Sequence, residues 1–443
     1  MNKSQGESDA DDPGEYLSMS LTVRILIALA LGLVTGIALS EWGGALDEKV
    51  VAVAQPVGKA WLNGLQMPLI PLIFALLVTG VAQATQSARG GGVAARAIGL
   101  FAVLLTASAA VAALLGPLLL HWWPVPSGAV AALAGAGPAS DVGDVRPSAE
   151  WLLGFIPANP IKAASEGQVV AVVLFALAFG FAVTRIAPEP RERLNGLFGG
   201  LVDALLVLVG WVLWLAPIGV FALALVAGSR SGIATAGALL HYIAFIVLLC
   251  LVVTLLLYPM VVILGRIAPG RFARAAFPAQ AIAFSTQSSI ASLPAMIQAS
   301  DGPLAVRAST RAIVLPLAIS LFRITSPPAN LGVALYVAAM NGIAIGPAQL
   351  VMGVLVAAIV SLAAVGLPSQ ITFFTTTGPI CLAMGVPVEA LPLLLAVETA
   401  PDIFRTVGNV TADMGVTRIL DRWGDDGQQS VSADAMDGGG IEP

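Results

Sequence analysis

The chain has 443 residues, of which 58% are hydrophobic and only 11% are charged. Soluble domains usually carry about 25% charged residues, so this composition excludes a soluble globular protein and indicates an integral membrane protein. The net charge of −5 comes mostly from acidic stretches near the two ends, and no basic patch indicates nucleic-acid binding. Cys250 and Cys381 are isolated in apolar runs, which excludes a disulfide framework and a cysteine-based metal site.

The first 264 residues contain a polar start and then six apolar runs. We expect residues 1–20 to form a disordered N-terminal tail rather than a cleaved signal peptide. The runs have membrane-spanning length and are Leu21–Leu39, Val53–Val81, Arg96–Trp123, Gln168–Ile186, Leu197–Gly228 and Leu239–Leu264. Arginines cluster after the second, fourth and sixth runs, whereas the other loops are poor in basic residues. The positive-inside rule therefore places the N-terminus and the even-numbered loops in the cytoplasm.

The stretch 271–300 is apolar at both ends and rich in hydroxyl side chains in the middle. Arg274 and Arg307 flank its core on either side, and both are arginines of the cytoplasmic type. A segment that enters and leaves a membrane on one side is a re-entrant hairpin, whose tip must be shielded by protein or line a cavity. The alternative is a plain helix whose hydroxyls bond back to its own turns.

Two further segments show irregular patterns. Residues 306–340 form a spanning run that contains Arg323 and the consecutive Pro327 and Pro328. Two such prolines do not fit a regular helix interior, so we expect a helix broken near the middle of the membrane. Residues 349–384 repeat the hairpin pattern. If this second hairpin enters from the opposite side, the two halves are inverted repeats with a binding site where their tips meet.

The last predicted helix, 386–418, carries a polar stripe and precedes an acidic C-terminal tail at 419–443. The stripe consists of Glu398, Asp402, Arg405, Asn409 and Asp413. Spacings of three and four residues put all five side chains on one helical face about 80° wide. Such residues inside a bilayer almost always face a protein interior or a water-filled cavity. The stripe is therefore either a structural ion-pair network or a binding face for a polar solute and a coupling ion.

Five motifs in a fixed order resemble the glutamate/dicarboxylate:cation symporter family, which includes the excitatory amino acid transporters, and indicate a divergent member of prokaryotic type. The motifs are Pro157–Pro160, Ala216–Phe221, the serine-rich tip ending at Pro294, Gly366–Pro368 and the pattern from Asp402 to Asp413. The resemblance implies an all-α fold of eight transmembrane helices and two opposed re-entrant hairpins, related as inverted repeats. It also implies a homotrimer, with helices 1, 2, 4 and 5 as a scaffold and helices 3 and 6 in an elevator-type transport domain.

The resemblance also implies roles for individual residues. Arg405 resembles the arginine that grips a substrate carboxylate, a role that suits its planar guanidinium. Asp402 resembles the acid that takes the substrate amino group in amino-acid carriers. Asn409 resembles a residue that contacts substrate and cation, and Asp413 resembles a sodium ligand. The other expected substrate contacts are Thr406, Ser288, Ser289, Pro368, Ser369 and Gln370.

The broken helix departs from the family pattern. Where the family carries Asn-Met-Asp-Gly-Thr, this chain reads Phe322–Ser326, so two oxygen ligands are missing and Arg323 adds a positive charge. Sodium needs several oxygen ligands. We expect altered or reduced sodium coupling, with proton coupling as an alternative, and Arg323 either neutralises an acid or replaces a bound sodium. The expected coupling residues are Asp413, Asn409, Glu398, Arg323, Thr325 and Ser326, with a sodium ion at Asp413 and Asn409.

The leading interpretation is secondary active transport of a small carboxylate, such as aspartate, glutamate or a dicarboxylate, across the inner or plasma membrane. The alternatives are an uncoupled conductance for anions or organic acids and a substrate sensor derived from a transporter. We expect no enzymatic activity, because the serine cluster has no nearby histidine or lysine to act as a base. We expect no cofactor beyond a co-transported ion, and the expected partners are the carboxylate, the lipid bilayer and two further copies of the chain.

Overall fold

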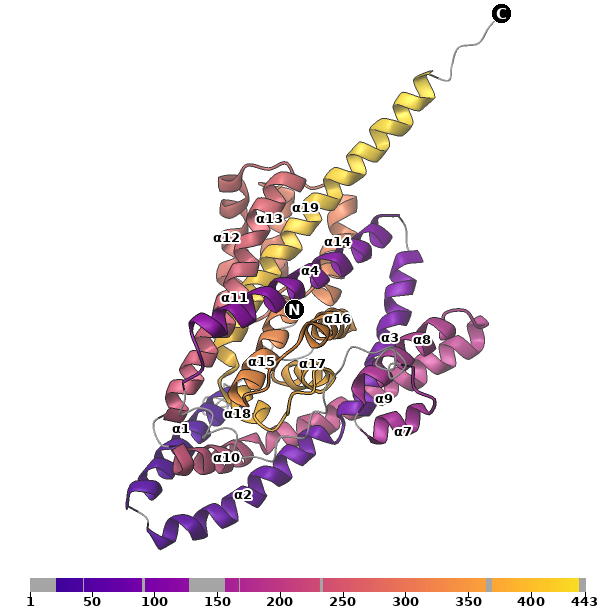
Figure 1. The fold of residues 1–443 in the computed structure, drawn as a ribbon. Coiled ribbons are helices and arrows are strands. Elements are labelled where there is room, and N and C mark those ends of the chain that lie inside the picture. Colours follow the sequence, from indigo (N-terminus) through magenta and orange to yellow (C-terminus); the bar gives the residue numbers. More distant parts are fainter. Residues whose placement is uncertain are drawn as a thin grey trace, which may run out of the picture.

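The computed structural model describes residues 21–42, 44–89, 92–126, 156–166, 168–231, 234–363 and 369–437. These residues form helices joined by turns and loops, and Figure 1 shows their arrangement. The predicted N-terminal tail and the motif Gly366–Pro368 lie outside the described residues.

The structure describes nine helices in the N-terminal half, where six apolar runs were predicted. Two of the runs each form two helices, and the short helix α7 is additional. The helices are α1 (Leu21–Trp42), α2 (Ala45–Gln66), α3 (Leu69–Arg89), α4 (Gly92–Trp122), α7 (Pro160–Ser165), α8 (Val169–Val183), α9 (Pro188–Trp214), α10 (Ala216–Ser231) and α11 (Ala234–Leu264). The second and fifth predicted runs each divide in two, near Pro68 and near Pro217. Proline has no N–H to donate along a helix, which explains both interruptions.

The short helix α7 explains the first of the sequence motifs. Asn159 caps its N-terminus, and the side-chain oxygen accepts hydrogen bonds from the backbone N–H groups of Ile161 and Lys162, both at 3.0 Å. Pro160 occupies the first helical position, where its missing N–H costs nothing. The motif Pro157–Pro160 thus defines the start of a helix.

The C-terminal half is built from four consecutive helix pairs. The helices are α12 (Pro269–Thr286), α13 (Leu293–Asp301), α14 (Ala308–Leu321), α15 (Ser326–Met340), α16 (Pro347–Ala363), α17 (Ser369–Ala383), α18 (Leu391–Val397) and α19 (Thr399–Asp437). The pairs correspond to the two predicted hairpins, the broken helix and the polar final helix. The broken helix consists of α14 and α15, and its break lies at residues 322–325. Pro327 and Pro328 follow the break in the first turn of α15.

Two predictions about the final helix were wrong. It is not continuous, because it is interrupted at Glu398, where Pro401 has no N–H to donate to the Val397 carbonyl. It also does not end at residue 418, since α19 continues to Asp437 and projects beyond the other helices in Figure 1. The stretch predicted as a tail from residue 419 is therefore helical as far as Asp437. No proline interrupts it, and extending an existing helix costs far less than starting one.

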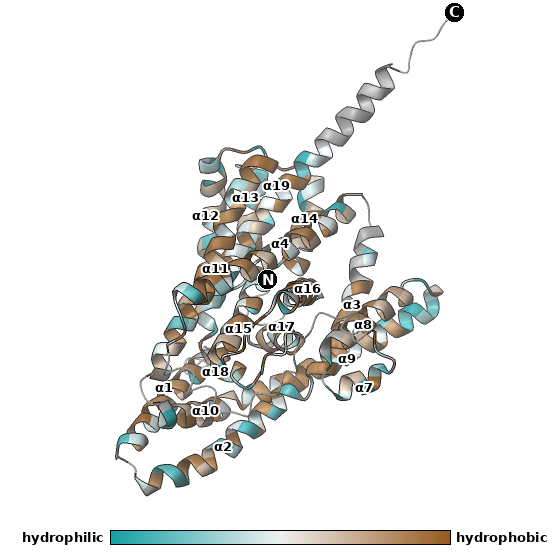
Figure 2. Ribbon diagram, viewed as in Figure 1, coloured by the Kyte–Doolittle hydropathy of each residue, from teal (hydrophilic) through white to brown (hydrophobic). Residues whose placement is uncertain are grey.

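By length and composition, six stretches of the described chain are suited to crossing a membrane. They are Val23–Trp42, Leu46–Ala82, Gly92–Trp122, Pro188–Trp214, Ala234–Leu264 and Ala308–Met340. Figure 2 shows hydrophobic residues along most of the helices, including those at the surface of the fold. The fourth predicted run forms α8, whose 15 residues are short for a span. The predicted total of eight spanning helices therefore stays a prediction.

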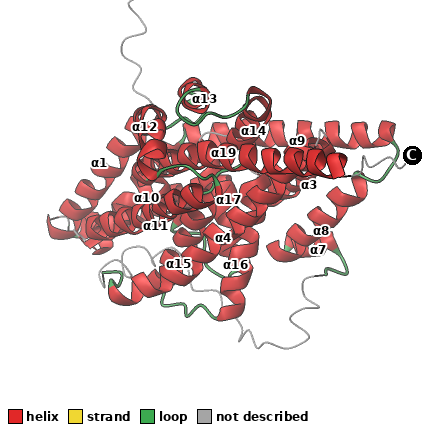
Figure 3. Ribbon diagram, turned by 90° about the horizontal axis from the view of Figure 1, so that it is seen from above, coloured by secondary structure: helices red, strands yellow, loops and turns green. Residues whose placement is uncertain are grey.

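The helices form three neighbouring groups around a buried centre. Helix α10 packs against α1 and α2, α3 packs against α8 and α9, and α19 packs against α11, α12 and α14. Helix α15 is buried along nearly its whole length and contacts α4, α11, α16 and α17. Figure 3 shows helices and loops throughout the described chain, and Figure 1 shows α19 next to α12 and α13, which it contacts. The polar residues of α19 thus face the middle of the protein.

Small residues let α1 and α10 approach closely. A Cβ atom added at Gly36 of α1 would overlap the backbone carbonyl oxygen of Leu225 in α10, and one added at Gly228 would lie 2.7 Å from the Leu33 carbonyl oxygen. Membrane helices commonly associate through such small-residue surfaces, because van der Waals contact replaces the hydrophobic drive available in water. Backbone-to-backbone contact therefore fixes this helix pair.

We predict that Gly36→Ala lowers the free energy of unfolding by about 1–3 kcal/mol, because the added methyl group meets backbone atoms that cannot turn aside. Denaturation of the purified protein in mild detergent measures this change. Gly99→Ala is the matched control, since open space surrounds Gly99 in α4. It should be neutral or stabilising by about 0.5–1 kcal/mol. Equal effects of the two substitutions would contradict the close packing.

Candidate functional site

The five residues of the polar stripe lie in the protein interior. Glu398, at the junction of α18 and α19, is 2% exposed, and Asp413 in α19 is 1% exposed. Asp402, Arg405 and Asn409 between them are also buried. The helical spacing read from the sequence therefore produces one buried polar face. Its neighbours come from α11, α12, α15 and the break before α15.

Arg405 is the centre of a hydrogen-bonded network. Its Nη1 lies 2.5 Å from Glu398 Oε1, and its Nη2 donates to the side-chain oxygen of Asn330 in α15. The Tyr242 hydroxyl in α11 donates to Glu398 Oε2 at 2.8 Å. The guanidinium in α19 thus contacts the α18–α19 junction and α15 directly, and it is linked to α11 through Glu398. Its positive charge is balanced by Glu398, which satisfies the requirement that a buried charge be paired and hydrogen-bonded.

Asn330 extends this network to α17. Its Nδ2 donates to Thr376 Oγ1 at 2.9 Å, and Thr377 Oγ1 donates to its Oδ1 at 3.3 Å. These threonines belong to the segment that follows the second predicted hairpin tip. Arg405 is therefore connected through one amide to the helix that leaves that tip.

The Nε–H group of Arg405 has no hydrogen-bond partner within the described parts of the chain. A carboxylate that binds an arginine in the side-on bidentate mode uses Nε together with one Nη. One donor of that pair is thus unused in this structure. One N–H of Nη1 donates to Glu398 and one N–H of Nη2 donates to Asn330, so a carboxylate that also took over the Nη1 contact would compete with Glu398 for the guanidinium.

The broken helix is attached to α19 by Thr325. Its backbone N–H donates to Asn409 Oδ1 at 3.1 Å, and its hydroxyl lies 2.8 Å both from that oxygen and from the Arg405 carbonyl oxygen. Gly408 permits this approach, because a Cβ atom there would overlap the Thr325 side chain. Ser326, also predicted to act in cation coupling, begins α15 and is partly buried.

Arg323 and Asp413 form a second, looser charge centre. Asp413 is buried, and neither carboxylate oxygen has a hydrogen-bond partner among the described residues. Arg323 is partly buried and interacts electrostatically with both Asp402 and Asp413. Glu398–Arg405 is a close ion pair of the stripe, and Arg323 acts on two of its other acids.

The sodium site predicted at Asp413 and Asn409 has one oxygen already engaged. Asn409 Oδ1 accepts a hydrogen bond from the Thr325 N–H and lies 2.8 Å from the Thr325 hydroxyl, which is equally close to the Arg405 carbonyl oxygen. A sodium ion at Asn409 would therefore compete with Thr325 for this oxygen. Within the described chain, no cluster of three or more acidic, histidine or cysteine side chains has the arrangement of a metal site.

The first predicted tip is a turn at residues 287–292 beside the Arg405 end of α19. Phe284 meets Phe404 edge to face, with ring centroids 6.4 Å apart, and Gln280 Nε2 donates to Thr411 Oγ1 at 2.7 Å. Ser288 accepts hydrogen bonds within the turn, from the N–H groups of Ala291 and Ser292. Ser288 and Ser289 are partly buried and make no hydrogen bond to the stripe within the described structure.

The remaining predicted substrate contacts are placed less completely. Thr406 is buried, and its hydroxyl donates to the Asp402 carbonyl oxygen one turn earlier in α19. Ser369 begins α17, and Gln370 follows it. Pro368 and the side chains of Ser369 and Gln370 lie outside the described residues.

Sequence reasoning missed four residues of the Arg405 network: Tyr242, Asn330, Thr376 and Thr377. Asn330 had a detectable signal, because an amide in an otherwise apolar membrane segment is expensive unless it has a partner. Tyr242 lies in a long apolar run and gave no comparable signal, since tyrosine is common in membrane helices. Its role depends on where α11 packs.

A profile of the sodium:dicarboxylate symporter family matches residues 21–423. The chain belongs to this family. It is 24% identical to the proton/glutamate-aspartate symporter of Escherichia coli, with 92% of this chain and 93% of that protein aligned. It is 28% identical to the neutral amino acid transporter B(0) of rabbit, Oryctolagus cuniculus (96% and 84% aligned), and 24% identical to the C4-dicarboxylate transport protein 1 of Pseudomonas aeruginosa (95% and 92% aligned).

Membership confirms the resemblance found in the sequence motifs. The symporter is a membrane transporter of the dicarboxylate and amino-acid class, and its relatives are transporters rather than enzymes. Ions in this family are co-transported rather than held as cofactors. The buried stripe of α19 is therefore the candidate transport site.

We predict that Tyr242→Phe destabilises the symporter by about 1–3 kcal/mol, because it leaves Glu398 Oε2 buried without its donor. A double-mutant cycle with Glu398→Gln should give a coupling energy of about 0.5–3 kcal/mol. Denaturation in mild detergent provides the measurement. Tyr242→Phe combined with Gly99→Ala is the control, and those two effects should add. Additive effects of Tyr242→Phe and Glu398→Gln would contradict the network.

Proposed function

We propose that the symporter carries a small carboxylate, either an acidic amino acid or a C4-dicarboxylate, across the inner or plasma membrane. The observation that carries this proposal is Arg405, a buried guanidinium that pairs with Glu398 and whose Nε–H has no hydrogen-bond partner among the described residues. Arginine is the side chain best suited to planar, bidentate recognition of carboxylates. The printed activities of the relatives, glutamate-aspartate symport and C4-dicarboxylate transport, support the same substrate class.

The substrate carboxylate takes the place of Glu398 at Arg405 in this proposal. Two carboxylates next to one guanidinium would leave a net negative charge in a buried site, which is strongly unfavourable. Glu398 therefore takes up a proton when the substrate binds and keeps a hydrogen bond to Tyr242. One proton then travels with each substrate molecule, on Glu398. Asp402, one turn from Arg405, receives the amino group when the substrate is an amino acid.

Cation coupling is altered at the second charge centre. Arg323 supplies a fixed positive charge that acts on Asp413, whose carboxylate is otherwise without a described partner. A tethered guanidinium at this place substitutes for a bound sodium ion and repels another one. Sodium coupling is thereby reduced, and Asp413 with Asn409 keeps at most a weakened cation site next to Thr325 and Ser326.

The architecture proposed for transport follows from the helix pairs. Helices α12 and α13 form one re-entrant hairpin and α16 and α17 the opposed one, with the tips at Ser288–Ser289 and Pro368–Gln370 closing over the substrate from opposite sides. Both termini lie in the cytoplasm, and three copies assemble through the scaffold helices. The network from Arg405 through Asn330 to Thr376 supports this proposal, because it joins the final helix to the segment leaving the second tip.

We predict that Arg405→Ala weakens binding of aspartate, glutamate and succinate about 100-fold or more, because it removes a buried charged partner. Calorimetry on the purified protein measures binding. Arg405→Lys should keep part of the affinity, since it preserves the charge but not the planar fork. Arg405→Ala combined with Glu398→Gln removes both charges of the pair and keeps the test valid if the single variant does not fold. Unchanged binding in the folded double variant would refute the role of Arg405.

We predict that uptake into proteoliposomes runs on an imposed proton gradient in the absence of sodium. Arg323→Gln should lower this uptake and make it respond to sodium, because Asp413 then lacks its neighbouring cation. Arg311→Gln is the matched control in α14, where it removes an arginine that pairs with Asp301 away from Asp413. Strict dependence of the unaltered protein on several sodium ions would overturn the proposal. Currents without saturable substrate exchange would instead favour the uncoupled conductance, and binding without uptake would favour a sensor.

A further inference from the structure

A small polar pocket lies where the end of α3 meets the α8–α9 junction, in a different helix group from the transport site. Its volume is about 150 Å³, and its polar lining consists of Thr85, Gln86, Thr184, Arg191, Glu192 and Asn195. Helices α3, α8 and α9 that carry these residues are packed together. The pocket belongs to the end of the fold at which the positive-inside rule places the cytoplasm.

Two groups in this pocket have unused hydrogen-bonding capacity. Arg191 is partly buried, and its guanidinium makes neither an ion pair nor a hydrogen bond with the described residues. Asn195 Oδ1 is buried and has no donor in that same part of the chain. A buried acceptor without a donor is costly, so its presence next to an unused cation calls for an explanation. A ligand with an anionic group and a hydroxyl would satisfy both.

An apolar groove continues from the polar pocket. Its volume is about 390 Å³, and it is lined by hydrophobic side chains that include Leu77, Val81, Ile98, Phe181, Ile359 and Leu362. Thr85 lines both hollows, and the neighbours Val81 and Ala82 each line one of them. The walls come from α3 and α8 on one side and from α4 and α16 on the other. The combined cavity is polar at one end, where Arg191 and Glu192 both line it, and apolar along the rest.

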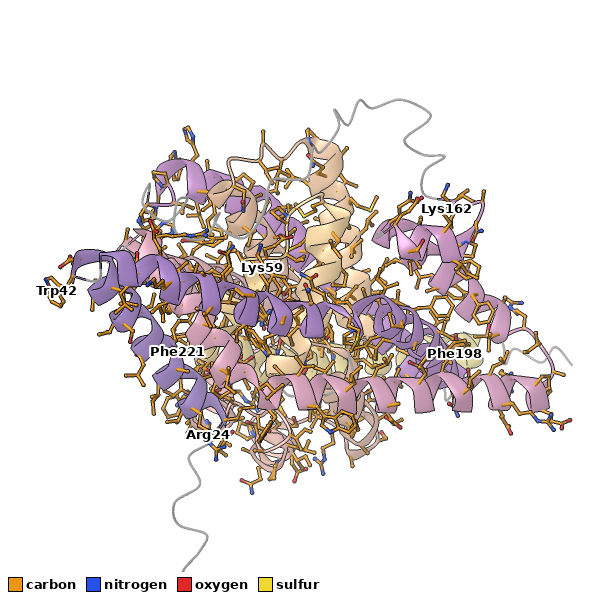
Figure 4. The ribbon with its side chains drawn as sticks, turned by 90° about the horizontal axis from the view of Figure 1, so that it is seen from below. Arg24, Trp42, Lys59, Lys162, Phe198 and Phe221 are labelled. Atoms are coloured by element: carbon orange, nitrogen blue, oxygen red, sulfur yellow. The ribbon has the colours of Figure 1, made fainter. Side chains whose placement is uncertain are left out.

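The polar end is built on a rigid support. Phe74 of α3 contacts Phe175 and Phe179 of α8 and Phe198 of α9, with ring centroids between 5.6 and 5.9 Å apart. Figure 4 shows Phe198 on the side of α9 that faces these helices. Interlocked rings of this kind hold the three helices together. Arg191 and Asn195 lie within seven residues of Phe198 on the same helix, so their backbone positions are fixed.

We propose that this cavity binds one anionic phospholipid. The phosphate pairs with Arg191, a headgroup hydroxyl donates to Asn195 Oδ1, and one acyl chain lies in the groove between α3 and α16. The Arg191 guanidinium, the Asn195 oxygen and the apolar groove match the phosphate, a headgroup hydroxyl and an acyl chain of such a molecule. A free phosphate would leave the groove unused, and a hydrocarbon would leave Arg191 and Asn195 unsatisfied. The site does not depend on which solute the symporter carries.

The experiment is titration of the delipidated full chain with phosphatidylglycerol in detergent, followed by native mass spectrometry. Arg191→Gln should weaken phosphatidylglycerol binding about tenfold, because it removes one charge-assisted contact. Arg193→Gln is the matched control, since Arg193 is exposed two residues away and pairs with Glu189. It should leave binding unchanged. Ile98→Trp, which fills the groove without altering charge, should weaken the same binding by a similar factor.

Three results would overturn the proposal. Equal binding by Arg191→Gln and Arg193→Gln would exclude a specific headgroup contact. Equal affinity for phosphatidylcholine, which has no net charge, would exclude recognition of an anionic lipid. Displacement of phosphatidylglycerol by inorganic phosphate, together with normal binding in Ile98→Trp, would show a plain anion site without an acyl chain. Arg191 and Ile98 lie on different helices, α9 and α4. If one of the two variants fails to fold, the other still tests the proposal.

Discussion

The structure depends on the balancing of the buried positive charge of Arg405. A guanidinium surrounded by protein inside a membrane is tolerated only when a counter-charge and hydrogen-bond acceptors surround it. Glu398 supplies the charge and Asn330 an amide oxygen, while Tyr242 holds Glu398 in place. These contacts come from α11, α15 and the α18–α19 junction. The need to satisfy one side chain therefore fixes how three segments meet.

The interruption at Glu398 belongs to the same arrangement. Glu398 and Arg405 are seven residues apart, two helical turns, and their side chains meet at 2.5 Å. Pro401 removes a backbone hydrogen bond between them, so the backbone can depart from regular helix there. The irregular turn places the carboxylate against the guanidinium. A local defect in the helix thus gives the charge pair its geometry.

The sequence was sufficient to predict the features that depend on local rules. The spacing of Asp402, Arg405 and Asn409 predicted one face, and the prolines after Thr325 predicted the break. Contacts between helices that are distant in the sequence could not be predicted from it. Tyr242 and Asn330 reach Arg405 only because α11 and α15 pack around α19, and no periodicity within either segment encodes that distance. The helical extension to Asp437 was missed because acidic composition suggested disorder, while backbone continuity favoured helix.

The two charge centres differ in how firmly they are held, and one residue connects them. Arg405 is held by direct contacts, whereas Asp413 interacts electrostatically with Arg323 and has no hydrogen bond to its carboxylate within the described part of the chain. Thr325 touches both centres, since its hydroxyl reaches the Arg405 carbonyl oxygen and Asn409 Oδ1 together. A change at Arg405 that shifts its backbone therefore alters the hydrogen bonds of Asn409, one turn from Asp413. Because the Asp413 carboxylate has no hydrogen-bond partner among the described residues, this centre is the less firmly held of the two, and Thr325 gives the proposed substrate site a physical connection to the proposed ion site.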